Sequence, residues 1–329
     1  MTKIRAAITA VEGYLPDYIL TNEELSEMVD TTDEWIMTRI GIKERHILKE
    51  KGKGSSDLGE VVVKNILKNK NIDPSEIELL ICCTVTPDML FPATANIIAD
   101  KCGIKNGFGF DINAGCSGFI NGLTTAAKYI ESGFVKKVIV VGAEKMSTIV
   151  DYTDRSVCPI FGDGAGAVLL EATEEEVGFM DAILLADGVG KKHLHQKAGG
   201  SVNPPTHESI DNREHYIYQE GQQVFKWAVT KMAEATEALM KANNLTSDDI
   251  SYLLPHQANL RIITATGERL GLDPKKVLIN IEKYGNTTSA TIPILMWENQ
   301  DKFKKGDNLI LTAFGAGFTW GAIWIKWAI

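Results

Sequence analysis

The sequence predicts an α/β fold built from two related halves. Segments with strand character alternate with segments of helical character along most of the 329 residues, a pattern typical of sheets covered by helices. The chain is too long for one small core, and its 44% apolar and 23% charged residues are ordinary for a globular protein. A third observation is an internal repeat that relates the N-terminal part to the C-terminal part.

The individual elements follow from periodicity and from turn residues. Strands are expected at 4–14, 78–86, 108–112, 137–143 and 165–172, and helices at 60–70, 93–103 and after Cys116. Residues 188–213 are polar and rich in Gly and Pro, which predicts a long surface excursion, and 222–244 predicts a long amphipathic helix. The glycine-rich stretches 161–167 and 313–321 lack the spacing of a nucleotide-binding fingerprint, so we interpret both as hairpin turns.

The order strand, helix, strand, helix, strand occurs twice in the chain. It spans residues 78–143 and again 251–317, where the middle strand is expected within 276–288. The charged run TEEEVG near residue 176 marks a boundary between the copies. We therefore expect an N-terminal half at 1–175 and a C-terminal half at 176–329.

The repeat gives two polar residues equivalent places. Cys116 precedes Val138, in the third strand of its copy, by 22 positions, and Asn286 precedes Leu309 by 23. Each residue lies at the start of the helix that follows a middle strand. An equivalent position in two packed halves predicts that both side chains face the same cleft.

Charge and cysteine usage exclude several classes of protein. The net charge of −9 argues against a nucleic-acid-binding protein and against binding to an acidic membrane surface. The five cysteines have no CxxC spacing, which favours reduced thiols in a cytoplasmic protein over disulfides or zinc. His193 and His195 lie on a polar loop without further ligands, so no metal site is expected. We expect no signal peptide and no membrane span.

Cys116 has two interpretations. Free cysteines are among the most buried residues, so it could be a core thiol. At a helix start, however, unpaired N–H groups and the helix dipole lower a thiol pKa. Its neighbours Ala114, Gly115, Ser117 and Gly118 leave space for an acyl group and expose N–H donors. The position favours a nucleophile.

His256 and Asn286 are the two polar residues that could meet this thiol. His256 follows the strand YLL, where a lone histidine is more often a structural hydrogen-bonding residue. Asn286 precedes a helix, where asparagine is a common N-cap. The repeat brings both toward the cleft of Cys116, and this favours a functional role for each.

Several motifs resemble the β-ketoacyl-[acyl-carrier-protein] synthase III family, the condensing enzymes that start type II fatty acid synthesis. They are AGCSGF, FGDGAGA, PHQANLRI, YGNTTS and FGAGFTWG, and residues 32–47 (TDEWIMTRIGIKERHI) resemble the family's N-terminal signature. The resemblance covers nearly the whole chain. It implies the thiolase fold, a duplicated five-layered αβαβα body with mixed sheets, and a homodimer.

The resemblance also implies a mechanism. Cys116 would take an acyl group from acyl-CoA, and His256 and Asn286 would stabilise the enolate formed when a malonyl group on acyl-carrier protein loses CO₂. The backbone N–H groups of Cys116 and Ala316 would form a second oxyanion hole, although the family usually has Gly at the position of Ala316. Coenzyme A enters as a thioester substrate, and no cofactor is implied.

Four further residues match positions that contact coenzyme A. Trp35 and Arg39 would hold the adenine, with Trp35 stacking on it, and Arg155 matches a second nucleotide contact. Asn259 matches a residue that orders the polar network of the site.

Another four positions match the acyl pocket and the docking surface of the family. Phe91 matches a gate residue that reaches the partner subunit's acyl pocket, and Met146 would line the same region. Lys226 and Arg261 match basic residues at the tunnel mouth, where the acidic carrier protein docks. Glu268 stands where some members have lysine, which weakens this basic surface.

The numbers of cysteines and histidines exclude some alternative functions and leave others open. A biosynthetic thiolase needs a second cysteine in the C-terminal half, but all five cysteines precede residue 160, and no second histidine follows His256 as in elongating synthases. A related Cys-His-Asn condensing enzyme of polyketide or secondary metabolism, which would take CoA thioesters, is the main alternative. Thioester hydrolysis is a third; it would need a Cys–His ion pair and a path for water.

Overall fold

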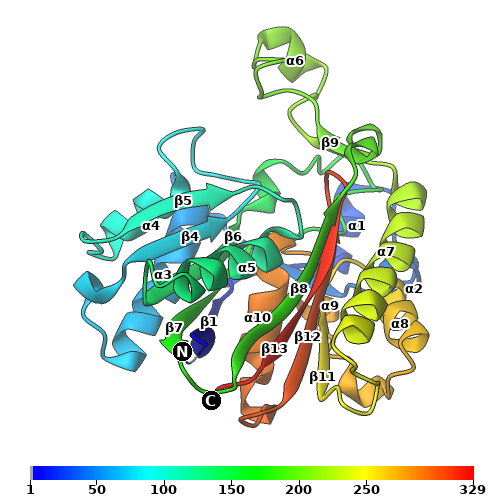
Figure 1. The fold of residues 1–329 in the computed structure, drawn as a ribbon. Helices are drawn as coiled ribbons and strands as arrows, with labels where there is room; N and C mark the ends of the chain where they lie inside the picture. Colours follow the sequence, from blue (N-terminus) through cyan, green and yellow to red (C-terminus); the bar gives the residue numbers. More distant parts are fainter. Residues whose placement is uncertain (1–2) are drawn as a thin grey trace.

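Two mixed sheets form the body of the protein, in a computed structural model that describes residues 3–329 (Figure 1). The first sheet has the order β1 (Arg5–Tyr14), β7 (Gly164–Thr173), β6 (Lys137–Glu144), β4 (Leu79–Cys83) and β5 (Phe108–Ile112). The second has the order β11 (Tyr252–Pro255), β12 (Asn308–Gly315), β13 (Thr319–Lys326) and β8 (Gly178–Ala186). Parallel pairs lie beside antiparallel pairs in both, so the prediction of mixed sheets is confirmed.

Helices form three layers around and between these sheets (Figure 1). The outer face of the first sheet is covered by α3 (Ser55–Lys70) and α4 (Thr94–Lys101), and that of the second by α7 (Gly221–Ala242), beside which α8 (Leu260–Arg269) packs. Between the sheets lie α5 (Gly118–Glu131) and α10 (Thr291–Asn299), which contact strands of both. The expected five-layered αβαβα arrangement is confirmed.

Helix α10 is apolar on nearly every side, whereas α5 buries one face and has Asn121, Thr125 and Lys128 on the other. Small residues let α5 lie close to the first sheet, since a Cβ atom at Gly122 would come within 2.5 Å of the Cys83 Sγ atom. The first turn of α10 consists of buried residues throughout. Both helices therefore present their N-termini at the centre of the molecule.

The middle strand predicted within 276–288 is wrong. This segment has two isolated bridges, Leu253 with Val277 and Phe161 with Asn286, and the short helix α9 (Ile281–Tyr284) lies between them. The buried side chain of Gln257 accounts for the difference, because its Oε1 atom accepts hydrogen bonds from the N–H groups of Asn280 at 3.0 Å and Ile281 at 3.1 Å. Those donors are therefore unavailable to a strand ladder.

One of the two predicted hairpin turns is confirmed and the other is wrong. Residues 316–318 do form the turn between β12 and β13. Residues 164–167, in contrast, lie within β7, which pairs with both β1 and β6. A Cβ atom at Gly166 would lie 2.8 Å from the Ile294 backbone nitrogen, so glycine here lets α10 approach the sheet.

The remaining elements flank the body. They are β2 (Tyr18–Thr21), α1 (Asn22–Met28), α2 (Asp33–Ile40), β3 (Glu44–Ile47), β9 (Leu194–Gln196), α6 (His207–Asp211) and β10 (Ile217–Gln219). The predicted surface excursion is confirmed as an arm, residues 188–216, whose helix α6 projects away from the sheets (Figure 1). Its two-stranded ribbon of β9 and β10 joins it to the start of α7.

The expected boundary after residue 175 falls between β7 and β8, which belong to different sheets. Because α10 packs on β1 and β7 as well as on β11, the sheets share one interior, and the division into two units stays a prediction. Within residues 3–329, no helix is both long and apolar enough to cross a membrane. The same part of the chain contains no cluster of three or more potential metal-ligating side chains.

Candidate active site

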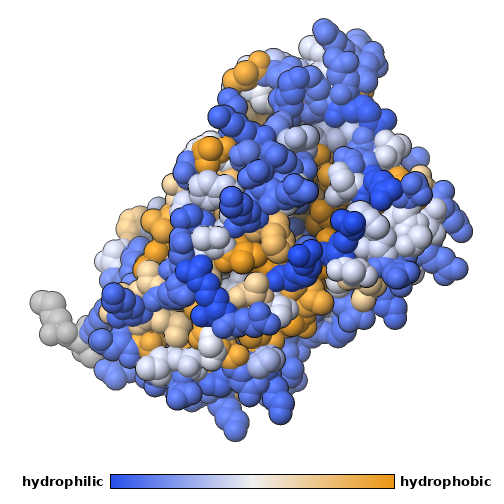
Figure 2. All heavy atoms as spheres, turned by 90° about the vertical axis from the view of Figure 1, so that its right-hand side faces the viewer, coloured by the Kyte–Doolittle hydropathy of each residue, from blue (hydrophilic) through white to orange (hydrophobic). Residues whose placement is uncertain are grey.

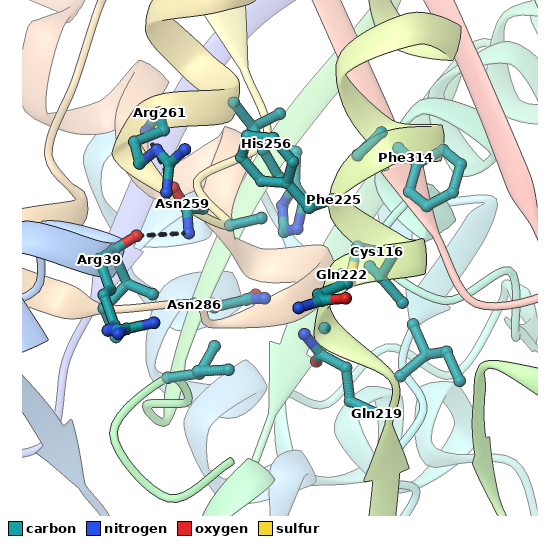
Figure 3. Close-up of a pocket in the computed structure, with 18 of the residues that line it drawn as sticks. Arg39, Cys116, Gln219, Gln222, Phe225, His256, Asn259, Arg261, Asn286 and Phe314 are labelled. Carbon is teal, nitrogen blue, oxygen red and sulfur yellow. Dashed lines mark hydrogen bonds between the residues drawn. The ribbon is translucent and has the colours of Figure 1, made fainter. Parts of the chain in front are cut away.

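A pocket of about 560 Å³ opens between α2, α7 and α8 and reaches the N-terminus of the buried helix α5. Cys116, His256 and Asn286 all line it. Figure 3 shows the three side chains directed toward one space, each from a different segment. Figure 2 shows the face that carries α7 and α8, where hydrophobic residues are exposed among hydrophilic ones. The structure thus brings together the three residues that the repeat predicted.

The Cys116 segment and the β12–β13 turn are packed tightly against each other. A Cβ atom at Gly315 would lie 2.4 Å from the Cys116 backbone nitrogen, and one at Gly115 would lie 2.6 Å from the Ala316 nitrogen. Gly115 also has a φ of 55°, in the left-handed region that favours glycine. Two hydrogen bonds join the same segments, from Ser117 Oγ to the Thr319 carbonyl at 3.0 Å and from Thr319 Oγ1 to Ala114 at 2.8 Å.

His256 is only 1% exposed and directly follows β11. Its Nδ1 atom lies 2.7 Å from the Thr291 hydroxyl at the start of α10. Its Nε2 atom is buried without a hydrogen-bond partner among the described residues. Burial lowers the pKa of His256 to about 3, so the ring is neutral at neutral pH.

Asn286 lies in the turn before α10. Its Oδ1 atom accepts a hydrogen bond from the Thr288 N–H at 2.8 Å, but the N-cap interpretation is wrong, because Thr287 caps the turn at 288–290 and Ala290 caps α10. The Asn286 side chain acts to lower the pKa of the Cys116 thiol. The catalytic role of Asn286 stays a prediction.

Burial opposes the expected lowering of the Cys116 thiol pKa. Burial raises the pKa of Cys116 to about 12, and the nearby Glu144 carboxylate adds to the rise. The Cys116 backbone N–H and the Asn286 side chain act in the opposite direction but do not overcome these effects. Desolvation of the thiolate is the physical reason.

Alkylation of Cys116 should report this raised pKa. Below its pKa, the thiolate fraction grows tenfold per pH unit, so the logarithm of the rate with iodoacetamide should rise with a slope of about 1 from pH 6 to at least pH 9. A short unstructured peptide with one cysteine serves as the reference, and its rate should level off near the ordinary cysteine pKa of about 8.5. Peptide mass spectrometry would confirm the site, and a plateau below pH 8 would contradict the raised pKa.

The residues expected to hold coenzyme A gather at the pocket mouth. Guanidinium groups of Arg39 and Arg155 lie 4.8 and 5.0 Å from the Trp35 ring centroid, so a base that stacks on Trp35 must displace one of them. Arg155 also pairs with Asp30 at 3.0 Å. Asn259 donates to the Arg39 carbonyl at 3.1 Å, which ties α8 to α2 (Figure 3).

The other predicted residues lie at different distances from the pocket. Arg261 lines it, with its guanidinium 5.0 Å from the Phe225 ring, and Lys226 is exposed beside it on α7. Phe91 is 83% exposed on the loop before α4 and does not line the pocket of its own chain. Met146 is buried in an apolar cluster and does not line the pocket either.

Two glutamines and one carboxylate were not expected from the sequence. Gln219 and Gln222 line the pocket, and Figure 3 shows them near Cys116. Gln219 ends β10 and Gln222 lies in the first turn of α7, and neither position is a strong signal for a site. Glu144 is fully buried at the end of β6, where it accepts hydrogen bonds from Thr86 and from Ser289. No local pattern in a buried strand could have indicated that role.

Comparison with known proteins identifies the family. The model described as 3-oxoacyl-[acyl-carrier-protein (ACP)] synthase III matches residues 110–188, and the model of its C-terminal part matches residues 240–327. A curated relative, β-ketoacyl-[acyl-carrier-protein] synthase III 2 of Bacteroides thetaiotaomicron, is 57% identical over 99% of this chain and 98% of its own length. The chain belongs to the 3-oxoacyl-[acyl-carrier-protein] synthase III family.

Other synthase III proteins agree over the full length. The synthase III of Porphyromonas gingivalis strain W83 is 56% identical over 100% of this chain and 98% of its own. The crystal structure of the synthase III from Aquifex aeolicus superposes with a TM-score of 0.90, at 40% identity, over 98% of this chain and 100% of that one. The sequence resemblance and the thiolase-type fold are thus confirmed, and the chain is a condensing enzyme with acyltransferase chemistry.

Proposed function

We propose that this synthase III joins an acyl group from acyl-CoA, acetyl-CoA in the first instance, to malonyl-acyl-carrier protein with loss of CO₂. The observation that carries the proposal is the meeting of Cys116, His256 and Asn286 at the floor of one pocket. The products are 3-ketoacyl-acyl-carrier protein, free coenzyme A and CO₂. This is the initiating condensation of type II fatty acid synthesis.

In the first half-reaction, the Cys116 sulfur attacks the acyl carbonyl. The thiol proton ends on the departing coenzyme A sulfur, so the acyl-enzyme and free coenzyme A form without net proton uptake. The backbone N–H groups of Cys116 and Ala316 serve as donors to the tetrahedral oxyanion. The close packing of Gly115 on the Ala316 amide supports this role.

In the second half-reaction, the malonyl carboxylate leaves as CO₂ and its electron pair forms an enolate. The enolate oxygen needs hydrogen-bond donors and no strong base. Asn286 supplies its amide, and neutral His256 supplies Nε2–H when the Thr291 hydroxyl, which donates to the Thr288 carbonyl at 3.0 Å, turns to donate to Nδ1 instead. The enolate carbon then attacks the acyl thioester, and the Cys116 sulfur leaves and regains a proton.

The pKa values of Cys116 and His256 argue against thioester hydrolysis of the cysteine-protease type. Such catalysis uses a thiolate paired with an imidazolium. Here burial raises the pKa of Cys116 to about 12 and lowers that of His256 to about 3. Neither shift favours the thiolate–imidazolium pair that this type of hydrolysis uses.

The extender substrate is tested by direct competition. Malonyl-acyl-carrier protein and malonyl-CoA are supplied to the acetylated enzyme at equal concentration, and 3-ketoacyl products are measured by mass spectrometry. We expect the carrier-protein product to predominate at least tenfold, because exposed Lys226 and Arg261 form a local basic surface on a chain of net charge −9. Predominance of the CoA product would favour the alternative, a polyketide-type enzyme.

We also propose that the enzyme is a cytoplasmic homodimer paired through β5. This edge strand has no second neighbour in its sheet, and Phe108 and Phe134 beside it are 42% and 69% exposed. An uncovered edge with an apolar patch is typical of an interface. A symmetric partner would also supply an acyl-pocket residue, the role proposed for the exposed Phe91.

A lysine at the β5 edge should separate the subunits. Phe108→Lys places like charges near the two-fold axis, and the mass measured by light scattering should fall from that of two chains to that of one. Val202→Lys is the matched control, because Val202 is 97% exposed on the arm. A Phe108→Lys protein that keeps the dimer mass would contradict this interface.

A further inference from the structure

Arg45 is a buried cation that the proposed chemistry does not use. It lies in β3 and is fully buried, and none of the ion pairs formed within residues 3–329 includes it. Its Nη1 donates to the Leu20 carbonyl at 3.0 Å and its Nη2 to the Pro159 carbonyl at 2.8 Å, while Nε has no partner. A buried charge held only by backbone carbonyls is destabilising, so its presence calls for a function.

The segment that begins at Pro159 is hydrogen-bonded to the backbone of Asn286 in the active site. The next residue, Ile160, accepts a hydrogen bond from the Asn286 N–H at 2.9 Å, and the Gly162 N–H donates to the Asn286 carbonyl at 3.1 Å. Phe161 and Asn286 thereby form an isolated parallel bridge. The segment 159–162 that Arg45 holds is therefore the segment that holds the Asn286 backbone.

The Arg45 side chain also packs directly against the two glycines next to this contact, Gly162 and Gly285. A Cβ atom at Gly162 would lie 3.1 Å from the Arg45 Cβ atom and 2.5 Å from the Tyr284 carbonyl oxygen. One at Gly285 would lie 2.9 Å from the Ile160 carbonyl oxygen and 3.4 Å from the Arg45 Cβ atom. The glycines leave no spare space, so a shift of Arg45 must move the Asn286 backbone.

We propose that Arg45 is a positioning residue for Asn286, and that its two carbonyl contacts hold the Asn286 amide at the place where the enolate oxygen forms. The inference rests on the proposed role of Asn286. A guanidinium suits the task because its planar fork reaches two carbonyls at once, whereas a lysine ammonium is a single point charge. The contacts to Leu20 and Pro159 are thus a reason for arginine at this position.

A double-mutant cycle tests the proposal. Arg45→Lys, Asn286→Ala and the double variant are made in the full chain, and folding is checked by circular dichroism. Acetylation of Cys116 and condensation with malonyl-acyl-carrier protein are measured separately. We expect Arg45→Lys to slow condensation at least tenfold and acetylation less than threefold, and to have no further effect on condensation in the Asn286→Ala background.

Three results would overturn the proposal. Equal losses in both half-reactions, or additive losses in the double variant, would show a general structural role. An unchanged condensation rate in folded Arg45→Lys would show that Asn286 needs no such support. If Asn286→Ala alone leaves condensation intact, the proposed function of Asn286 fails instead, so the two failures are distinguishable.

A second variant covers the case in which Arg45→Lys does not fold. Gly162→Ala leaves the Arg45 cation in place, but its Cβ atom would clash with the Tyr284 carbonyl and push the segment 159–162 away from it. This variant should show the same selective loss of condensation. Gly188→Ala is the matched control, because a Cβ atom there meets nothing within 4 Å. If neither Arg45→Lys nor Gly162→Ala folds, Arg45 is needed for the fold itself and the proposal is withdrawn.

Discussion

Replacement of Cys116 by alanine is expected to abolish both the acetyl adduct and condensation. Removal of a covalent nucleophile leaves only binding and the oxyanion donors, so the rate should fall by about 10⁴-fold or more. The wild-type protein, incubated with acetyl-CoA, should gain a single acetyl group on the peptide that contains residue 116. Peptide mass spectrometry and product formation measure the two effects.

The other cysteines provide the control. Cys102 is a free buried thiol that lies outside the pocket, and burial raises its pKa to about 12 as it does for Cys116. Cys102→Ala should therefore keep the adduct and the activity. An adduct of equal yield on Cys116→Ala, or no adduct on the wild type, would disprove the assignment of the nucleophile.

Replacement of Asn286 by alanine is expected to separate the two half-reactions. Loss of one oxyanion donor should slow condensation by about 10²- to 10³-fold. Acetylation should slow by less than about tenfold, because there the amide only helps to offset the effect of burial on the thiol pKa. Stopped-flow release of coenzyme A and the rate of 3-ketoacyl product formation measure the steps.

The second function of Asn286 requires its own control. The Asn286→Ala change also removes the Oδ1 acceptor of the Thr288 N–H, which could disturb the start of α10. Asn286→Asp keeps that acceptor, removes the amide donor and adds a negative charge, so condensation should be at least as slow in this variant. Rapid condensation in Asn286→Asp would contradict a donor role for the amide.

Much of the architecture could be predicted because it depends on local periodicity. The sequence alone predicts the alternation of strands and helices. It also predicts the surface excursion at 188–213 and the repeated order of elements in the two halves. The failure at 276–288 has a tertiary cause, since the Gln257 side chain takes the backbone donors of that segment. The glycines at 164–167 were misread because their reason is the approach of α10, which is distant in sequence.

Some residues of the candidate site could likewise be predicted from the sequence, and others could not. Cys116, His256 and Asn286 could be found from their places in the repeat, since equivalent positions in two halves face one cleft. Met146 packs in an apolar cluster that also contains the pocket residue Ile160, and its place in the acyl pocket stays a prediction. Arg45 lies in the stretch 32–47 that resembles the family signature, but neither its role nor that of Glu144 could be predicted, because their partners Pro159 and Ser289 come from distant parts of the chain.

By itself, the sequence determined which residues could meet and the chemistry they could perform together, because side-chain type and repeat position are properties of the chain. Only the tertiary structure decided their charge states. The pKa of Cys116 near 12 and that of His256 near 3 come from burial. Burial is produced by the packing of two sheets around α5 and α10, and no local segment contains that information.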